Sequence, residues 1–397
     1  MLHGIDGLGV ATTAMAVLLL RALPASAVAL VSKGVSAGDR AVVVLLYAAL
    51  AAWVGRLAPV HIERLAVLCA ALGYWILAAA LVAALVRAGA WRRVPAPAAL
   101  ILVAAVWLAA PAALLTGPAR AAVVLAGVDG MFSIYSLVRD GGPRTPLRDS
   151  LFFLLVDPTL VLSQRARRVA APGLRRRDAA RLALGVAAVA ASVALALAAA
   201  PLLSGPRGLA VEAPLYARAM AIAGIMALSF YAGHSGVASI QIALLSMLGF
   251  RVGERYVFPL AATSPRDFWR RWNVHLGQWL RCYAYIPCVR SLGRRVPVPV
   301  ADAIAVLAAF GLCGVLHAGV QLLIHGRMPW TVVAAFGVHG CALVAWDRAA
   351  RAWQARPGRG TGSAASREVS RLLFLQFSLV MLLWLYPALA GASTSAR

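Results

Sequence analysis

The sequence predicts an all-α, polytopic integral membrane protein with about 9–11 transmembrane helices plus re-entrant or interfacial helices. Three observations lead to this fold class. Apolar residues make up 62% of the 397-residue chain and charged residues only 13%, whereas soluble domains average about 45–50% and about 25%. Several apolar runs reach the roughly 20 residues that a helix needs to cross a bilayer. Basic residues are concentrated between those runs.

The apolar runs give the candidate membrane spans. In chain order they are residues 10–31, 41–59, 65–86, 96–116, 120–138, 182–204, 214–249, 299–325, 331–347 and 372–390. The run 214–249 is too long for one crossing, so we expect a span followed by a second helix or a break near "GHSG" at 233–236. The run 151–163 is too short to cross and contains Asp157-Pro158, so we expect it to be re-entrant or interfacial.

The distribution of charge predicts the orientation in the membrane. The net charge is +24, and nearly all of the basic residues are arginine. A basic chain can bind nucleic acid, but arginines also concentrate in the cytoplasmic loops of membrane proteins. We therefore predict a multi-pass protein of the inner cell membrane with cytoplasmic basic loops and no nucleic-acid partner. The loop 164–181 would lie against anionic lipid, although a phosphorylated substrate or carrier could also use it.

Other function classes are disfavoured by what the sequence lacks. It contains no P-loop, no GxGxxG after a strand, no HExxH and no GxSxG. We therefore expect no metal site and no tightly bound cofactor. The 14 acidic residues lie mostly in loops, and this scarcity of carboxylates within the spans disfavours an ion-coupled transporter. The five cysteines form no CxxC pair, and we interpret them as packing residues.

The segment "DFWRRWNVHLGQWLRCYAYIP" at 267–287 combines tryptophan and arginine in an otherwise aliphatic chain. Its periodicity predicts an amphipathic helix over 268–283 that lies at the membrane interface, with Asp267 as a cap. The apolar face of this helix would contain Trp269, Trp272, Asn273, Leu276, Leu280 and Tyr283. The polar remainder would contain Arg270, Arg271, His275, Gln278 and Arg281, with Trp279 on the border.

The same pattern separates Asn273 from His275. Asn273 would face the apolar side, where an unpaired amide costs about 1–3 kcal/mol, so the amide needs a partner. That partner is either a neighbouring helix, which would make Asn273 structural, or a substrate. His275 would lie on the polar face, as a histidine that contacts solvent or lipid headgroups.

His317 lies well inside the apolar segment "FGLCGVLHAGVQLLIHG" at 310–326. An ionisable side chain at that depth is a candidate functional residue. Burial would favour the neutral imidazole that a general base requires, although a hydrogen bond to a neighbouring helix would also explain the residue. His339 and His234 also lie beside glycines, and His234 would line a cavity if the helix breaks there.

Successive motifs of this chain resemble those of the membrane-bound O-acyltransferases. They are "GHSGVASIQIALLSMLGF", "FPLAATSPRDFWRRWNVHLGQWLRCYAYIP", "GVLHAG" and "FGVHG", within a signature block at 231–347. They are most similar to the bacterial branch that includes alginate O-acetylating and teichoic-acid D-alanylating proteins. The resemblance implies a helical fold with a central tunnel, in which an acyl group passes from a thioester to a hydroxyl.

The resemblance also implies roles for individual residues. His317 matches the near-invariant intramembrane histidine of the family and would be the general base. Asn273 matches the second polar position and would orient the thioester carbonyl, stabilise its oxyanion or align the imidazole. The arginines, Arg266 among them, would contact phosphates of coenzyme A or of a carrier, or else anchor in lipid headgroups. The expected substrate- and donor-binding residues are Trp269, Arg270, Arg271, Trp272, Arg281, Tyr283, His234 and His339.

Departures from the bacterial pattern leave the substrates open. Asn273 stands where that branch usually has histidine and is similar to the lipid-acylating members. Cys282 replaces an aspartate, and residues 288–290 replace a Gly-Gly turn.

We expect an O-acyltransferase that uses acyl-CoA or an acyl-carrier thioester and acylates a glycan or glycosylated metabolite. The alternative acceptor is a lipid or long-chain alcohol, and a transporter or an inactive relative of the family is a third hypothesis.

The expected organisation is a single membrane-embedded acyltransferase domain, 1–397. It divides into N-terminal helices at 1–119, a catalytic core at 120–347, a cytoplasmic Arg/Gly/Ser loop at 348–371, and a last helix and tail at 372–397. The expected partners are the bilayer, the acyl donor and the acceptor, with an accessory transfer protein as a further candidate.

Overall fold

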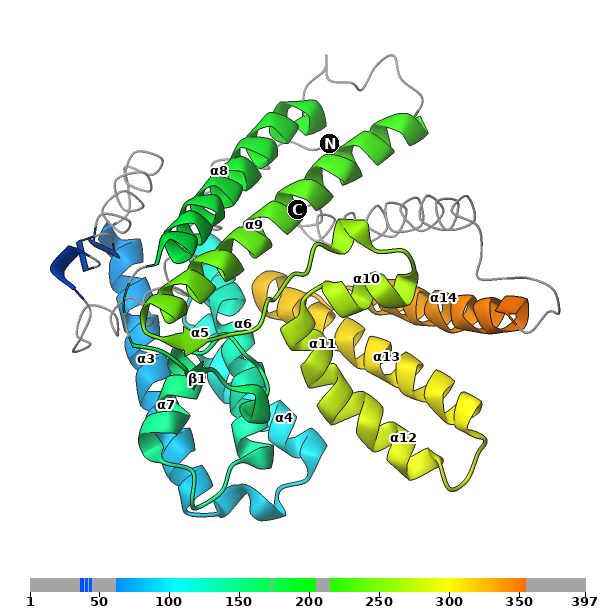
Figure 1. Cartoon of the computed structure of the whole chain (residues 1–397), viewed down its shortest axis with the longest axis horizontal. Helices are drawn as coiled ribbons and strands as arrows, with labels where there is room; N and C mark the ends of the chain where they lie inside the picture. Colours follow the sequence, from blue (N-terminus) through cyan, green and yellow to red (C-terminus); the bar gives the residue numbers. More distant parts are fainter. Residues whose placement is uncertain are drawn as a thin grey trace. The chain divides into compact units, whose positions relative to one another are not determined.

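The computed structural model describes residues 36–44 except 39 and 42, residues 62–204 except 172 and 174, and residues 215–354. These residues are mostly helical (Figure 1), and the sheet found among them has two strands. Among them, 6 helical segments are long and apolar enough to cross a membrane: 70–87, 96–113, 176–195, 228–247, 298–325 and 330–352. The all-α, polytopic fold class is confirmed. The predicted spans 10–31 and 372–390, nearly all of 41–59 and the loop from 355 onwards lie outside the described residues.

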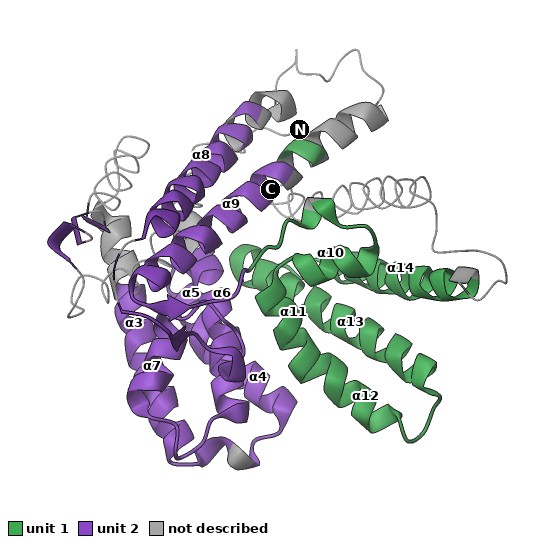
Figure 2. Cartoon of the chain, viewed as in Figure 1, with its two compact units in different colours: residues 1, 209–227, 255–397 green, residues 2–208, 228–254 purple. Residues whose placement is uncertain are grey.

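The chain divides into two compact units, which are coloured separately in Figure 2. Unit 1 contains residues 1, 209–227 and 255–397, and unit 2 contains residues 2–208 and 228–254. The motifs around Asn273, His317 and His339 all belong to unit 1. His234 belongs to unit 2.

Unit 2 is built from long helices, short helical turns and a small ribbon. Its elements are α3 (Ile62–Arg87), η1 (Ala90–Arg93), α4 (Ala96–Ala104), η2 (Ala105–Ala109), α5 (Ala110–Ala113), α6 (Gly117–Asp140), α7 (Leu147–Leu155), η3 (Leu162–Gln164), β1 (Arg167–Arg168), α8 (Arg176–Ser204), the later part of α9 (Leu215–Met247) and β2 (Phe250–Arg251). Two buried indoles join α3, η2 and α6. Trp75 Nε1 donates to the Trp107 carbonyl (3.1 Å), and Trp107 Nε1 donates to the Gly127 carbonyl (2.8 Å). Gly127 is required there, because a Cβ atom would lie 2.8 Å from the Trp75 ring.

The long apolar run at 214–249 forms one continuous helix, α9, so the predicted break near 233–236 is wrong. Its small residues serve close packing against α8. The hydroxyls of Ser192 and Ser229 each donate to the other residue's carbonyl, at 2.7 and 2.8 Å. A Cβ atom on Gly236 would lie 2.7 Å from the Gly185 carbonyl oxygen. Glycine therefore permits close contact between helices here, as it does between membrane helices generally.

The short run at 151–163 contains no helix long enough to cross a membrane. It begins in α7 and continues through a buried, non-helical segment that is organised by Asp157. Asp157 accepts hydrogen bonds from the backbone N–H groups of Thr159 (2.9 Å) and Ala166 (2.5 Å). Burial raises the pKa of Asp157 to about 6, against the opposing effect of these hydrogen bonds. The carboxylate is thus the group around which this loop folds.

Unit 1 contains the helices of the signature block that follow residue 255. They are η4 (Pro259–Ala261), α10 (Pro265–Arg271), α11 (Val274–Leu280), η5 (Arg281–Tyr285), α12 (Ile286–Leu292), α13 (Val298–His325) and α14 (Trp330–Gln354). The last two form a helical hairpin whose turn begins at Gly326, with φ of 73°. Two glycines allow the helices to approach closely. A Cβ atom would lie 3.0 Å from Phe336 Cβ at Gly314, and 3.1 Å from Phe310 Cβ at Gly340.

Candidate active site

The segment at 268–283 is not one amphipathic helix, so that prediction is wrong. α10 ends at Arg271, α11 begins at Val274, and Asn273 between them has φ of 38° and ψ of 60°. Backbone hydrogen bonds from residues outside the helix fix this break. Val257 N–H donates to the Arg271 carbonyl (2.9 Å), and Val274 N–H donates to the Arg255 carbonyl (2.8 Å). The segment at 255–257 therefore takes the hydrogen bonds that would have continued the helix.

Asn273 occupies a left-handed backbone conformation, which costs most L-residues about 1–2 kcal/mol but which asparagine adopts more readily. Its side-chain oxygen accepts a hydrogen bond from Arg255 Nε at 3.0 Å. Because a guanidinium can only donate, the atom that faces Arg255 must be the oxygen. The amide therefore keeps its two N–H donors for another group, so it is oriented as a donor.

Arg255 lies outside the set of site residues that the sequence predicts, yet it is buried at 6% exposure. It lies in "GERYVF", just outside the tryptophan-arginine motif. The only signal in the sequence was a charged residue next to a conspicuous motif, and such residues are common at membrane interfaces. The backbone hydrogen bonds that bring it to Asn273 are a tertiary feature.

The prediction that His275 lies on a polar face is also wrong. His275 is buried, with 6% exposure, and Trp279 is buried as well, with 1% exposure. The break at Asn273 resets the helical phase, so α11 presents a different face from the one that a continuous helix would present. Trp279 was expected on the border and instead is one of the largest fully buried side chains of the described residues.

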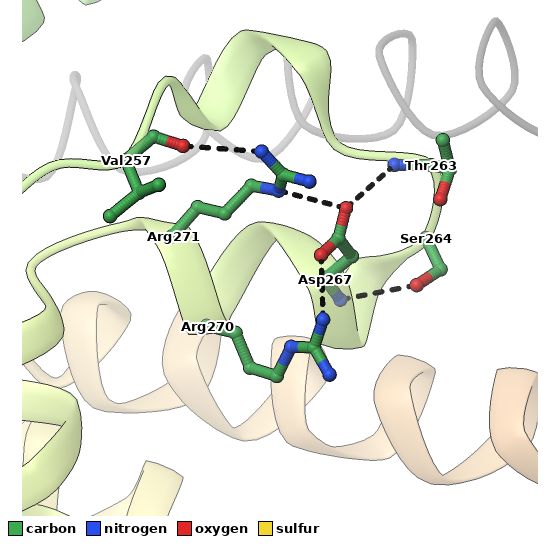
Figure 3. Close-up of polar contacts among 6 residues, drawn as sticks. All are labelled: Val257, Thr263, Ser264, Asp267, Arg270 and Arg271. Atoms are coloured by element: carbon green, nitrogen blue, oxygen red, sulfur yellow. Dashed lines mark hydrogen bonds and ion pairs between the residues drawn. The ribbon is translucent and has the colours of Figure 1, made fainter.

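The start of α10 carries a compact polar network (Figure 3). Ser264, rather than Asp267, is the N-cap, and its hydroxyl accepts from the Asp267 N–H at 3.1 Å. The Asp267 carboxylate accepts from the Thr263 N–H (3.2 Å), Arg271 Nε (2.9 Å) and Arg270 Nη2 (3.1 Å). Burial alone would raise the pKa of Asp267, but the hydrogen bonds from Arg271, Thr263 and Arg270 outweigh it and hold the pKa below its ordinary value. The carboxylate is therefore ionised at neutral pH and orients both arginines.

A hollow of about 390 Å³ lies beside this network. It is lined by Thr263, Ser264, Arg266, Asp267, Arg270 and Arg271. With three guanidiniums and one carboxylate, its lining carries a net positive charge. Arg270 contributes the most accessible guanidinium, with a side chain that is 73% exposed. Such a lining suits an anion with several oxygen atoms, because guanidiniums bind phosphate through paired N–H groups.

Arg266 is tied to the hairpin of unit 1. Its Nε donates to Asp347 Oδ2 at 2.9 Å, and its Nη2 lies 3.9 Å from Asp302. Asp302 in turn accepts from the Tyr285 hydroxyl at 2.5 Å. The hydrogen bond to Asp347 raises the pKa of the Arg266 guanidinium, and the hydrogen bond to Asp302 raises the pKa of Tyr285. This network therefore holds α10, η5, α13 and α14 together.

His317 lies on α13, eight residues before the helix ends at His325. Its Nδ1 lies 2.8 Å from the Cys313 carbonyl oxygen and 3.6 Å from the Cys313 sulfur. A carbonyl oxygen can only accept, so Nδ1 carries the proton and Nε2 carries the lone pair. The residue as a whole is exposed, although the helix around it is apolar and Nδ1 itself is partly buried. This tautomer presents a basic nitrogen away from the helix backbone.

Aromatic rings surround this part of the hairpin. The Phe336 ring centroid lies 4.7 Å from that of His317. Trp269 of α10 meets Phe310 and His339 edge to face, at centroid distances of 5.2 and 5.5 Å. Cys313, Ala318, Val332 and Phe336 form a buried cluster, with Trp269, Leu276, Leu280, Phe310, Met328 and Val333 packed against it. His317 thus sits in a predominantly apolar and aromatic environment.

The structure brings some of the predicted site residues together. Trp269 contacts His339, and both Trp269 and His317 contact Phe336, while Arg270 and Arg271 line the hollow. Trp272 stacks on Phe268, Tyr283 contacts the Trp279 ring, and Arg281 is exposed. His234 lies in unit 2, where its Nδ1 is 2.9 Å from the Phe230 carbonyl oxygen. Asn273 and His317 have separate hydrogen-bond partners, Arg255 and Cys313.

No group of three metal-binding side chains is found in the part of the chain that the structure describes. The described cysteines Cys282, Cys288, Cys313 and Cys341 are free thiols. The groups that the described residues offer for chemistry include an imidazole, an amide held by a buried arginine, and a basic hollow.

Fold and site together define a polytopic helical membrane protein with a histidine base candidate on an apolar helix. The model of the membrane-bound O-acyltransferase family matches residues 186–343, which include α10 to α13 and most of α14. This match supports membership of that family for the part of the chain that it covers.

Curated relatives agree with this family and differ in their acceptors. A probable long-chain-alcohol O-fatty-acyltransferase 1 of Arabidopsis thaliana is 31% identical over 36% of this chain and 40% of its own length. The long-chain-alcohol O-fatty-acyltransferase of Simmondsia chinensis is 34% identical over 29% of this chain and 34% of its own. A probable alginate O-acetylase of Pseudomonas syringae is 39% identical over 17% of this chain and 13% of its own. The matches thus span well under half the length of each relative.

Proposed function

We propose that this protein is a membrane-bound O-acyltransferase that moves an acyl group from a thioester to a hydroxyl, with His317 as the general base. The observation that carries the proposal is the His317 tautomer: Nδ1–H is held by the Cys313 carbonyl, which leaves Nε2 as the proton acceptor. The Phe336 ring packs beside the imidazole and the helix around it is apolar, which suits a reaction that must exclude water if hydrolysis is to be avoided.

The reaction would proceed through a tetrahedral intermediate. Nε2 of His317 takes the proton of the acceptor hydroxyl as its oxygen attacks the thioester carbonyl carbon. The N–H groups of Asn273 stabilise the oxyanion, because Arg255 engages the oxygen of that amide and polarises it. When the carbon–sulfur bond breaks, the imidazolium returns its proton to the thiolate. The free thiol and the ester are the products.

We propose that the basic hollow binds the phosphates of the donor, either coenzyme A or a phosphopantetheine carrier. Arg270 and Arg271 are oriented by Asp267 and line the hollow, while Arg266 is anchored by Asp347. The exposed Arg281 would add positive charge to the same unit.

Replacing Arg270 with glutamine is expected to raise the KM for acyl-CoA about fivefold, the upper range for one exposed charge pair. The KM for the matching acyl-pantetheine, which lacks the nucleotide phosphates, should stay unchanged. Steady-state kinetics with both donors would measure this difference. Arg290→Gln, an exposed arginine on α12 outside the hollow, is the matched control. Equal effects on both donors, or an equal effect of the control, would contradict donor-phosphate binding by Arg270.

The acceptor has two candidate classes. A glycan or glycosylated metabolite is the acceptor suggested by resemblance to the alginate branch. A long-chain alcohol is favoured by a specific observation, the apolar and aromatic environment of His317 and Trp269. A hydroxyl on an apolar chain can enter such a site without losing the many hydrogen bonds that a sugar makes with water.

The deciding experiment incubates purified protein with labelled acetyl-CoA and palmitoyl-CoA, each with hexadecanol or an oligosaccharide. Mass analysis of the products shows which pair is used. We expect a wax-type ester from palmitoyl-CoA and hexadecanol. A product from acetyl-CoA and the oligosaccharide alone would assign the glycan acceptor. If neither pair reacts but activity appears when cell extract is added, an accessory transfer protein completes the reaction.

A further inference from the structure

The two-stranded ribbon of unit 2 presents two arginines on one face. β1 and β2 are antiparallel, and Arg167 lies directly opposite Arg251. The Phe250 ring stacks on Phe152 at a centroid distance of 4.5 Å and packs against the core of unit 2. Since successive side chains of a strand point to opposite faces, Arg251 and its partner Arg167 project away from that core.

Two like charges placed opposite each other destabilise a pair of strands. Arg167 and Arg251 are both exposed, and the structure shows no ion pair to either among the described residues. Arg165, two residues away, differs because its Nη2 lies 3.7 Å from Asp149. An anion that binds between Arg167 and Arg251 would remove the repulsion, and two guanidiniums offer planar forks of donors that match a phosphate.

The backbone fixes this pair at the ends of two apolar helices. α8 begins at Arg176 and α9 ends at Met247, and each contains a candidate membrane span. The Gly249 carbonyl accepts from the N–H groups of Val169 (2.8 Å) and Ala170 (3.2 Å). Gly249 has φ of 82°, and a Cβ atom there would lie 2.1 Å from the Ala170 oxygen. The ribbon is therefore a fixed feature a few residues from the membrane-crossing segments.

We propose that Arg167 and Arg251 bind the phosphate of an anionic phospholipid at the membrane surface. The exposed Val169 beside this pair favours a lipid over a soluble anion. It follows Arg167 by two residues, which places it on the same face of the extended chain, and it is 58% exposed. A valine that enters the headgroup layer is removed from water, whereas a soluble phosphate would leave it exposed. This site is separate from the proposed acyl transfer and does not depend on it.

Native mass spectrometry of the purified protein with equal amounts of phosphatidylglycerol and phosphatidylcholine tests the proposal. The wild type should retain phosphatidylglycerol preferentially. Arg167→Gln/Arg251→Gln should lower that preference by at least about fivefold, the attraction expected from one basic residue near an anionic surface. Arg167→Lys/Arg251→Lys should keep most of it. The matched control is Arg294→Gln/Arg295→Gln, which removes the same charge from two exposed residues of unit 1.

Several outcomes would overturn this assignment. An unchanged preference in the glutamine double variant excludes the site, and an equal loss in the control variant shows that only net charge matters. Displacement of phosphatidylglycerol by equimolar inorganic phosphate or coenzyme A would assign the pair to a soluble anion. Should the glutamine double variant fail to fold, as judged by thermal unfolding, Arg251→Gln and Val169→Ser are compared singly, and retention of the full preference by both would refute the proposal.

Discussion

Replacing His317 with alanine is expected to reduce acyl transfer by about 10²- to 10⁴-fold while leaving folded protein in the membrane. The reason is that Nε2 is the proton acceptor in the proposed reaction and has no substitute when the ring is removed. His317→Gln should be equally inactive, because its amide can still donate to the Cys313 carbonyl but provides no basic nitrogen. Turnover per folded molecule, with the folded amount taken from size exclusion in detergent, is the quantity to compare.

The matched control for this experiment lies on the same helix. His325 ends α13 and is exposed. His325→Ala should therefore keep wild-type turnover and a similar unfolding temperature. Turnover of His317→Ala within tenfold of the wild type would rule out the general-base role, whereas loss of folded protein in both His317 variants would make the residue structural.

Replacing Asn273 with alanine is expected to lower turnover at least tenfold, which corresponds to roughly 1.4 kcal/mol of barrier. The same change also removes one hydrogen bond of the buried Arg255, that of Nε to the Asn273 oxygen, and a lost hydrogen bond to a charged group costs about 1–3 kcal/mol of stability. A third effect is backbone strain, because alanine must adopt the positive φ of this position. Activity and stability should therefore both fall in this variant.

Asn273→Gly separates these effects. Glycine adopts positive φ without cost, so Asn273→Gly should unfold at a higher temperature than Asn273→Ala. It has no amide, so its turnover should remain as low as that of Asn273→Ala. If Asn273→Gly recovers wild-type turnover, the amide has no part in catalysis and asparagine is there to allow the helix break. Thermal unfolding and single-turnover rates on the same preparations distinguish these results.

The long helices follow from local physics. The predicted runs at 65–86, 299–325 and 331–347 coincide closely with α3, α13 and α14, because a run of about 20 apolar residues satisfies its backbone internally and buries its side chains wherever it packs. The place of His317 within an apolar helix could be inferred in the same way, and an imidazole there is a candidate functional residue whatever surrounds it.

Predictions that depended on helix continuity were wrong in two opposite ways. The "GHSG" stretch suggested a break, yet α9 continues, because Gly236 packs against Gly185 of a neighbouring helix. The segment around Asn273 suggested a continuous helix, yet it breaks, because Val257 and Arg255 supply competing backbone hydrogen bonds. Glycine and asparagine permit either a continuous or a broken helix. The segments of the same chain that pack against them decide which one forms.

The sequence by itself determined that this is a polytopic helical membrane protein, where most of its long helices lie, and that His317 belongs to an apolar helix. These properties depend on composition and on contacts within each helix. Only the tertiary structure decided that Asn273 ends one helix and starts the next, that Arg255 holds its oxygen, and that His275 is buried. These three features depend on contacts between segments that are distant in the sequence. The pattern of residues along one helix does not show which segments will pack against that helix.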